Sequence, residues 1–129
     1  MKILIYGISS SGKSYLTKNL SDILNIPFIN GDMVREKFND KDFSEQGRIR
    51  QAERMLSLAD NYKEVLVDFI CPYKEYQDKF DIKILMDTKV KSNYPDTDLI
   101  FEKGNPDIVI TDFNYDLNYI KHEIQNLYN

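Results

Sequence analysis

Cysteine, histidine and long apolar runs are nearly absent from this sequence of 129 residues. The single cysteine, Cys71, cannot form an intramolecular disulfide, and no spacing of cysteine and histidine is typical of a zinc site. The apolar run at residues 1–7 is too short for a signal-peptide core or a membrane-spanning helix. We therefore expect a cytoplasmic protein that does not enter a membrane.

The sequence also lacks an excess of positive charge. Its formal net charge of -4 argues against nucleic acid or an anionic membrane as the main partner. All four arginines nevertheless lie in one short stretch, at Arg35, Arg48, Arg50 and Arg54. A guanidinium group binds phosphate or sulfate in a bidentate manner, so this stretch is a candidate anion site. A solvated helix face is the alternative interpretation.

No internal repeat and no linker divides the chain, which suits a single domain over residues 1–129. Five short apolar segments predict strands that are buried on both faces, at 2–6, 27–30, 64–69, 82–87 and 107–111. Apolar side chains at helical spacing predict helices within 16–24, 49–59 and 117–127, and a shorter helix is expected over 32–38. This alternation predicts a three-layer α/β domain with a five-stranded parallel sheet flanked by helices.

One segment, residues 88–105, shows no helical stripe. A loop of this length inside a compact domain is uncommon unless it covers or binds a ligand. We therefore expect a lid loop here.

The strongest motif is GISSSGKS, residues 7–14, which matches the P-loop pattern G-x-x-x-x-G-K-[ST]. It follows an apolar strand and precedes an amphipathic helix, so its backbone N–H groups can surround the phosphates of ATP. Lys13 should bridge the β- and γ-phosphates, and the Ser14 hydroxyl should bind Mg²⁺. The motif predicts a P-loop NTPase fold. The expected ATP-binding residues are Gly7, Ser9, Ser10, Ser11, Gly12, Lys13, Ser14 and Tyr15.

A carboxylate, Asp32, follows the second predicted strand. Ligands of parallel α/β sheets gather beyond the carboxyl ends of the strands, so Asp32 should face the same crevice as the P-loop. There it could accept a proton from an attacking hydroxyl or hold a metal-bound water. Its alternative role is to cap the helix that follows. Asp68, near the end of the third strand, is either a further carboxylate close to Mg²⁺ or a buried, hydrogen-bonded group.

The motifs together resemble the adenylylsulfate kinase family. The segments GISSSGKS, INGDMVR, DFSEQGRIRQAERM, FICPY and FEKGNPDIVI occur in the order and approximate spacing of that family. The resemblance implies transfer of a phosphoryl group from ATP to the 3′-hydroxyl of adenosine 5′-phosphosulfate in sulfate assimilation, with catalytic roles for Asp32 and Lys13 and a metal role for Ser14 and Asp32. The implied acceptor-binding residues are Asp32, Arg35, Phe43, Arg48, Gln51, Ile70 and Cys71. Among these, the arginines would hold the phosphosulfate and Phe43 would stack on the adenine.

The sequence departs from the family at three places. Asn30 replaces an aspartate, and Cys71 replaces a serine, which excludes a serine-linked phosphoenzyme. The family's lid helix with its Lys-Gly-Leu-Tyr motif has no counterpart in residues 88–105, so most of the lid is expected to be missing. Lys89 and Lys91 are candidates for its positive charge, and Tyr94 or Phe101 for a second stacking surface, without support from a motif. A solvated loop is the alternative for the two lysines.

These features predict a Mg²⁺-dependent kinase that uses ATP and acts on small-molecule nucleotides. Two alternatives stay open: a kinase for another small hydroxyl acceptor such as a nucleoside, nucleotide or sugar, and an ATP-binding accessory protein without transferase activity. We expect no nucleic acid and no membrane as partner, and the sequence is compatible with a homodimer.

Overall fold

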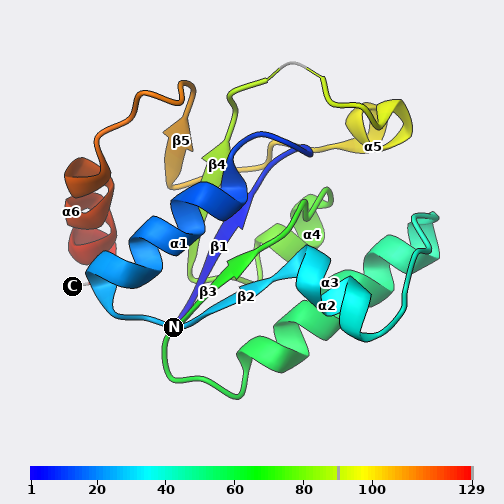
Figure 1. Ribbon diagram of the computed structural model, residues 1–129, viewed down its shortest axis with the longest axis horizontal. Helices are drawn as coiled ribbons and strands as arrows, with labels where there is room; N and C mark the ends of the chain where they lie inside the picture. The colour runs from blue at the N-terminus through cyan, green and yellow to red at the C-terminus, as the bar shows by residue number, and fades with distance from the viewer. Residues whose placement is uncertain (90, 129) are drawn as a thin grey trace.

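Five parallel strands form one sheet in the computed structural model, which describes residues 1–89 and 91–128 (Figure 1). The strand order is β2-β3-β1-β4-β5, so β1 lies at the centre of the sheet. The strands span Lys2–Tyr6 (β1), Phe28–Asn30 (β2), Val65–Asp68 (β3), Ile82–Met86 (β4) and Ile108–Ile110 (β5). All five predicted strands and the parallel sheet are confirmed.

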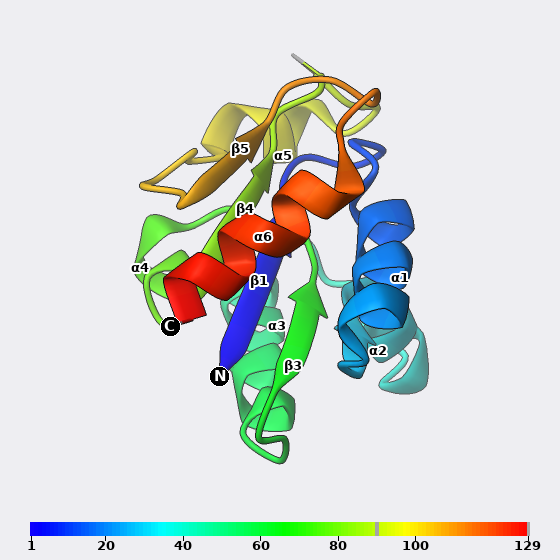
Figure 2. The same ribbon diagram turned by 90° about the vertical axis from the view of Figure 1, so that its left-hand side faces the viewer.

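The helices cover both faces of this sheet and complete the three layers. They span Lys13–Leu24 (α1), Gly31–Lys37 (α2), Glu45–Ala59 (α3), Lys74–Gln77 (α4), Pro95–Ile100 (α5) and Leu117–Tyr128 (α6). Helices α1 and α6 pack on one face, and α2 and α3 pack on the other (Figures 1 and 2). None of the described helices is long and apolar enough to cross a membrane.

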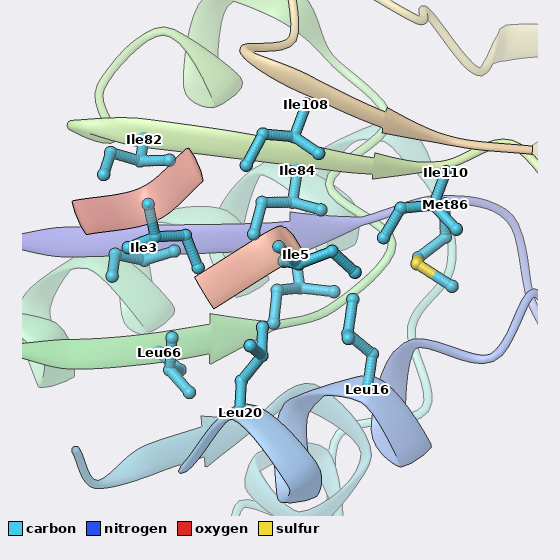
Figure 3. Close-up of a cluster of buried hydrophobic side chains, with 12 residues drawn as sticks. Ile3, Ile5, Leu16, Leu20, Leu66, Ile82, Ile84, Met86, Ile108 and Ile110 are labelled. Atoms are coloured by element: carbon cyan, nitrogen blue, oxygen red, sulfur yellow. The ribbon is translucent and has the colours of Figure 1, made fainter. Parts of the chain in front are cut away.

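Alternation along the central strand explains why both faces of the sheet are apolar. Ile3 and Ile5 on β1 point toward α1 and α6, where they join Leu16 and Leu20 of α1 (Figure 3). Leu4 and Tyr6 point to the opposite face, toward α3. Each such side chain is fully buried and contributes about 1.5–3 kcal/mol relative to exposure. The core therefore fixes β1, and with it the P-loop that follows.

The segment expected to be a lid loop is not a loop throughout, because it contains α5. Pro95 is the first residue of this helix, and Asp96 and Asp98 lie in its first turn, where negative charge is favourable. The helix has only six residues and buries only Thr97, so no apolar stripe marks it in the sequence. Val90, within the expected lid, and Asn129, the last residue of the predicted domain, lie outside the described residues.

Candidate active site

A cavity of about 430 Å³ lies beyond the carboxyl ends of the central strands. Its lining comes from the P-loop, α2, α3, the loop after β3, α5 and the loop after β5. The predicted residues on its wall are Ser9, Ser10, Gly12, Lys13, Ser14, Tyr15, Asp32, Arg35, Phe43, Arg48, Gln51, Ile70 and Cys71. Gly7 and Ser11 are buried and do not line it. Segments far apart in the chain thus meet where the motifs predicted a common site.

The P-loop passes over the start of α1 in a conformation that depends on Gly12. Gly12 has φ of 96°, in the left-handed region, and a Cβ atom there would lie 2.8 Å from Cε1 of Phe113. Ser10 also has a positive φ, of 63°. These turns direct the chain into α1, which begins at Lys13, so the free N–H groups of the first helical turn face the cavity. An anion such as a phosphate group fits this arrangement.

Lys13 is the cation beside this nest of N–H groups. Its Nζ donates to the carbonyl oxygen of Ile8 at 2.9 Å. Burial lowers the pKa of Lys13, and the negative charges of Asp68 and Asp32 oppose that effect. Asp68 is only 2% exposed, and burial raises its pKa against the opposing influence of Asn30 and Lys13. A bound polyphosphate would add further negative charge beside this half-buried lysine and favour its charged form.

Asn30 connects three parts of the site through one amide group. Its Nδ2 donates to Ser14 Oγ at 3.1 Å and to Asp68 Oδ2 at 2.9 Å. Its Oδ1 accepts from the backbone N–H of Met33 at 3.1 Å and so caps α2. The N-cap of α2 is therefore Asn30, and the alternative that Asp32 fills this role is wrong. Asp32 lies in the first turn of α2, with an exposed side chain that lines the cavity.

The oxygen atoms in this region suit a magnesium ion. Mg²⁺ keeps several water ligands and takes one or two protein oxygens together with phosphate oxygens. Ser14 and Asp32 are exposed on the cavity wall, and the Asp68 carboxylate lies next to Ser14 through the shared contact with Asn30. The donor set therefore fits the metal that the motif implies.

Three of the four arginines converge on one carboxylate, that of Asp40. Arg35, Arg50 and Arg54 approach its oxygens at 3.5, 3.2 and 3.2 Å, respectively. The Asp40 side chain is only 8% exposed, and hydrogen bonds from the backbone of Asp42 and from Arg50 hold its pKa below the ordinary value. The arginine cluster is thus largely an internal ion-pair network, which neither of the two interpretations of this stretch described.

Arg48 differs from the other arginines in its partner. Its Nη2 donates to Thr97 Oγ1 of α5 at 3.0 Å. Its Nε is buried without a hydrogen-bond partner, and the residue lines the cavity. Within residues 1–89 and 91–128, Arg48 forms no ion pair with a carboxylate, so its positive charge is available to a ligand.

Comparison with known proteins agrees with this geometry. The sequence matches the profile of the family described as adenylylsulphate kinase over residues 1–104. The chain belongs to the adenylylsulphate kinase family. It is therefore an ATP-binding P-loop kinase, a phosphotransferase, and the resemblance noted from the motifs is confirmed. A search of curated protein sequences finds no match.

Solved structures of other P-loop kinases share the fold. The APS kinase CysC of Mycobacterium tuberculosis in complex with AMPPNP and APS is 22% identical, with a TM-score of 0.71 over 98% of this chain and 96% of that one. Shikimate kinase from Aquifex aeolicus is 19% identical, with a TM-score of 0.67 over 98% and 94%. A gluconokinase from Sinorhizobium meliloti 1021 is 17% identical, with a TM-score of 0.67 over 98% and 95%. At these identities the likeness establishes the fold alone.

The remaining acceptor-site predictions concern one aromatic and three residues near the sheet. Phe43 lines the cavity, 49% exposed, and the Arg35 guanidinium lies 4.3 Å from its ring centroid. Gln51 is buried, and its amide donates to the Gly31 carbonyl oxygen at 3.1 Å, so it supports α2 from behind. Ile70 and Cys71 form the floor, and burial raises the pKa of the Cys71 thiol.

The four lid residues named from the sequence do not line the cavity. Lys89 and Lys91 are exposed, and Tyr94, the N-cap of α5, is 58% exposed. Phe101 is half-buried, with its ring centroid 6.1 Å from that of Tyr6. Phe101 is therefore part of the packing below the lid.

Thr97 and Phe113 line the cavity but lie outside every motif quoted from the sequence, so sequence reasoning missed them. Thr97 reaches the cavity from α5, and its only sequence signal is the helix start formed by Pro95 and two aspartates. Phe113 comes from the loop after β5 and packs against Gly12, which is far away in the sequence. No local pattern indicates that contact.

Proposed function

We propose that this kinase transfers the γ-phosphoryl group of Mg-ATP to the 3′-hydroxyl of adenosine 5′-phosphosulfate. The observation that carries the proposal is the pairing of two cationic places in one cavity: the P-loop with Lys13, and the guanidinium of Arg48, which no described carboxylate neutralises. A P-loop alone would serve any nucleotide-dependent enzyme. A second cation in the same cavity as an exposed aromatic ring, Phe43, favours an acceptor that is both anionic and aromatic.

Each residue of the P-loop region has a distinct task in this reaction. The N–H groups at the start of α1 and the Lys13 ammonium stabilise the charge on the phosphoryl group. Ser14 and Asp32 would hold Mg²⁺, with Asp68 close behind, and the metal neutralises charge on the phosphate oxygens. Asp32 orients the acceptor hydroxyl or accepts its proton. Positioning and charge stabilisation supply most of the rate enhancement in this reaction class.

The acceptor site uses the arginines unequally. Arg48 would hold the anion directly, because no carboxylate neutralises it among the described residues. Arg35 is bound to Asp40 and lies over the ring of Phe43, so its main role would be to support this ring as a stacking surface. Gln51, Ile70 and Cys71 would shape the floor, with the Gln51 amide already engaged by Gly31.

One observation favours a second candidate. Among the described residues, Arg35, Arg50 and Arg54 are paired with Asp40, which leaves one arginine, Arg48, without a carboxylate partner, and that number suits an acceptor with one negative charge. A kinase for another small anion that carries a hydroxyl group is therefore the alternative. The homodimer and the cytoplasmic location expected from the sequence remain predictions.

A panel of acceptors with labelled ATP tests the proposal. We expect adenosine 5′-phosphosulfate to be phosphorylated, with some wasteful hydrolysis of ATP because the lid is short. Arg48→Ala should weaken acceptor binding by about ten- to a hundredfold, the scale of a lost hydrogen bond to a charged group, and leave ATP affinity nearly unchanged. Arg50→Ala is the matched control, because Arg50 binds Asp40 and Asp42 outside the cavity. Phosphorylation of another acceptor, with adenosine 5′-phosphosulfate ignored at high concentration, would refute the proposed substrate.

A further inference from the structure

The geometry points to Thr97 as a positioning residue: we propose that its hydroxyl orients Arg48 toward the acceptor and holds α5 over the cavity. The inference deepens the proposed function and rests on it for the identity of the acceptor. Thr97 is 6% exposed, whereas Leu99 on the same helix is 85% exposed. The helix therefore directs its one buried side chain, a polar one, toward the site.

The choice of a hydroxyl as the partner of Arg48 has an electrostatic consequence. The Arg48 Nη2 to Thr97 Oγ1 distance is 3.0 Å, which is an ordinary hydrogen bond. A hydroxyl oxygen orients the guanidinium without cancelling its charge, in contrast to the Asp40 carboxylate that receives the other arginines. The buried Nε of Arg48 keeps a donor that no described protein atom accepts. Arg48 also lines the cavity, so the remaining N–H groups of its guanidinium can donate to a negatively charged oxygen of the acceptor.

The way α5 is attached explains why a single contact matters. Before the helix, Thr88 Oγ1 donates to the Ser11 carbonyl oxygen at 2.8 Å. After it, the Glu102 N–H donates to the Pro72 carbonyl oxygen at 2.8 Å, and the Tyr6 hydroxyl donates to the Lys103 carbonyl oxygen at 2.6 Å. Both ends of the segment are thus fastened to the domain.

Between these two attachments, α5 stands apart from the sheet, above α2 and α3 in the view of Figure 1. The carboxylate of Asp98 in this helix accepts hydrogen bonds from the backbone N–H and the hydroxyl of Ser92, which belongs to the same segment. Among the described residues, Thr97 makes the one side-chain hydrogen bond from α5 to another helix. Loss of its hydroxyl should therefore free α5 from α3 and leave the two attachments intact.

Kinetics on a matched pair of variants test the role of Thr97 toward the acceptor. Thr97→Val keeps the β-branched shape and removes the hydroxyl, whereas Thr97→Ser keeps the hydroxyl. We expect Thr97→Val to raise the KM for the acceptor by roughly three- to tenfold, the scale of one net hydrogen bond, with the KM for ATP unchanged. The ratio of phosphorylated acceptor to ADP should fall as water gains access. Thr97→Ser should behave like the wild type in both respects.

Hydrogen exchange tests the contact without any acceptor. The amides of Thr97 and Asp98, which donate to the Tyr94 carbonyl oxygen, should exchange roughly three- to tenfold faster in Thr97→Val than in Thr97→Ser or the wild type, because opening of α5 becomes easier by one hydrogen bond. Equal exchange in all three proteins, or equal KM values for the acceptor in the two variants, would overturn the inference. A wild-type protein that phosphorylates no acceptor would contradict the proposed function, and the exchange experiment would still decide whether Thr97 holds α5.

Discussion

The substitution Asn30→Asp tests whether the Asn30 amide joins the P-loop to the end of β3. Asn30 Nδ2 donates both to Ser14 Oγ, at 3.1 Å, and to Asp68 Oδ2, at 2.9 Å. Aspartate has the same shape and caps α2 equally well through the N–H of Met33. It has no donor, however, and it brings a second carboxylate against Asp68, which is 2% exposed. The variant therefore changes charge and donors and leaves the shape intact.

The loss of stability expected for Asn30→Asp has two contributions, a lost hydrogen bond and a repulsion between two carboxylates. Loss of a hydrogen bond to a charged group costs about 1.5–3 kcal/mol. Two negative charges at about 4 Å repel by about 4 kcal/mol at an effective dielectric constant near 20, and uptake of a proton limits this term. Together they predict that Asn30→Asp lowers the free energy of unfolding by roughly 2–5 kcal/mol at neutral pH without divalent cations. For a domain of this size the melting temperature should fall by about 8–20 °C.

Thermal unfolding in EDTA and in excess Mg²⁺ measures this effect without any assay of activity. Mg²⁺ should raise the melting temperature of Asn30→Asp more than that of the wild type, because a cation between the two carboxylates replaces the lost donors. Asn118→Asp is the control, since Asn118 is exposed at the start of α6 and the substitution adds the same charge. Equal melting temperatures of Asn30→Asp and the wild type in EDTA, or equal responses to Mg²⁺, would refute this account of Asn30.

Three further substitutions test other parts of the site. Lys13→Ala should keep the melting temperature and abolish measurable ATP binding in calorimetry; unchanged affinity would contradict the role of the P-loop. Asp32→Asn should lower turnover by roughly a hundredfold, the usual scale for a positioned acid or base, without loss of the fold, and full activity would make Asp32 structural only. Asp40→Asn should lower the free energy of unfolding measured with urea, by an amount that depends on pH. The pKa of Asp40 lies below its unfolded value of 3.8, so its charge stabilises the fold above that pH, and this contribution is lost as the pH falls through the folded-state pKa. The difference between wild type and Asp40→Asn should thus be constant at neutral pH and shrink below about pH 4, whereas a difference independent of pH would contradict the ion-pair network.

The sheet and the P-loop could be predicted because local sequence determines them. Continuous apolar runs such as residues 2–6 can be satisfied only by a strand that is covered on both faces. The glycines and the lysine of residues 7–14 have a backbone and charge requirement that few other segments meet. The five strands and the nucleotide-binding loop therefore follow from patterns within a few residues of each other.

The different binding partners of the four arginines could not be predicted in this way. Arg48 and Arg50 are two residues apart, yet one reaches Thr97 of α5 and the other reaches Asp40 before α3. Their directions depend on the phase of α3 and on where a distant helix lies. For the same reason the sequence marks Asn30 only as a departure from the family motif, because the partner of its amide, Asp68, is on another strand.

The segment that carries α5 is attached to the rest of the domain at both of its ends, before the helix at Thr88 and after it at Glu102 and Lys103. The hydrogen bond before the helix goes to Ser11 of the P-loop. Those after it go to Pro72 on the cavity wall and to Tyr6 of the central strand. Segments of different length can replace one another between two such attachments at a small cost in stability, since each doubling of the length of a flexible loop costs only about 0.6 kcal/mol of free energy. The ATP half of the site would be untouched by such an exchange. A change in how the acceptor is covered, in evolution or by design, can thus be confined to a short stretch of chain, while Arg48 and Phe43 keep their places on the cavity wall.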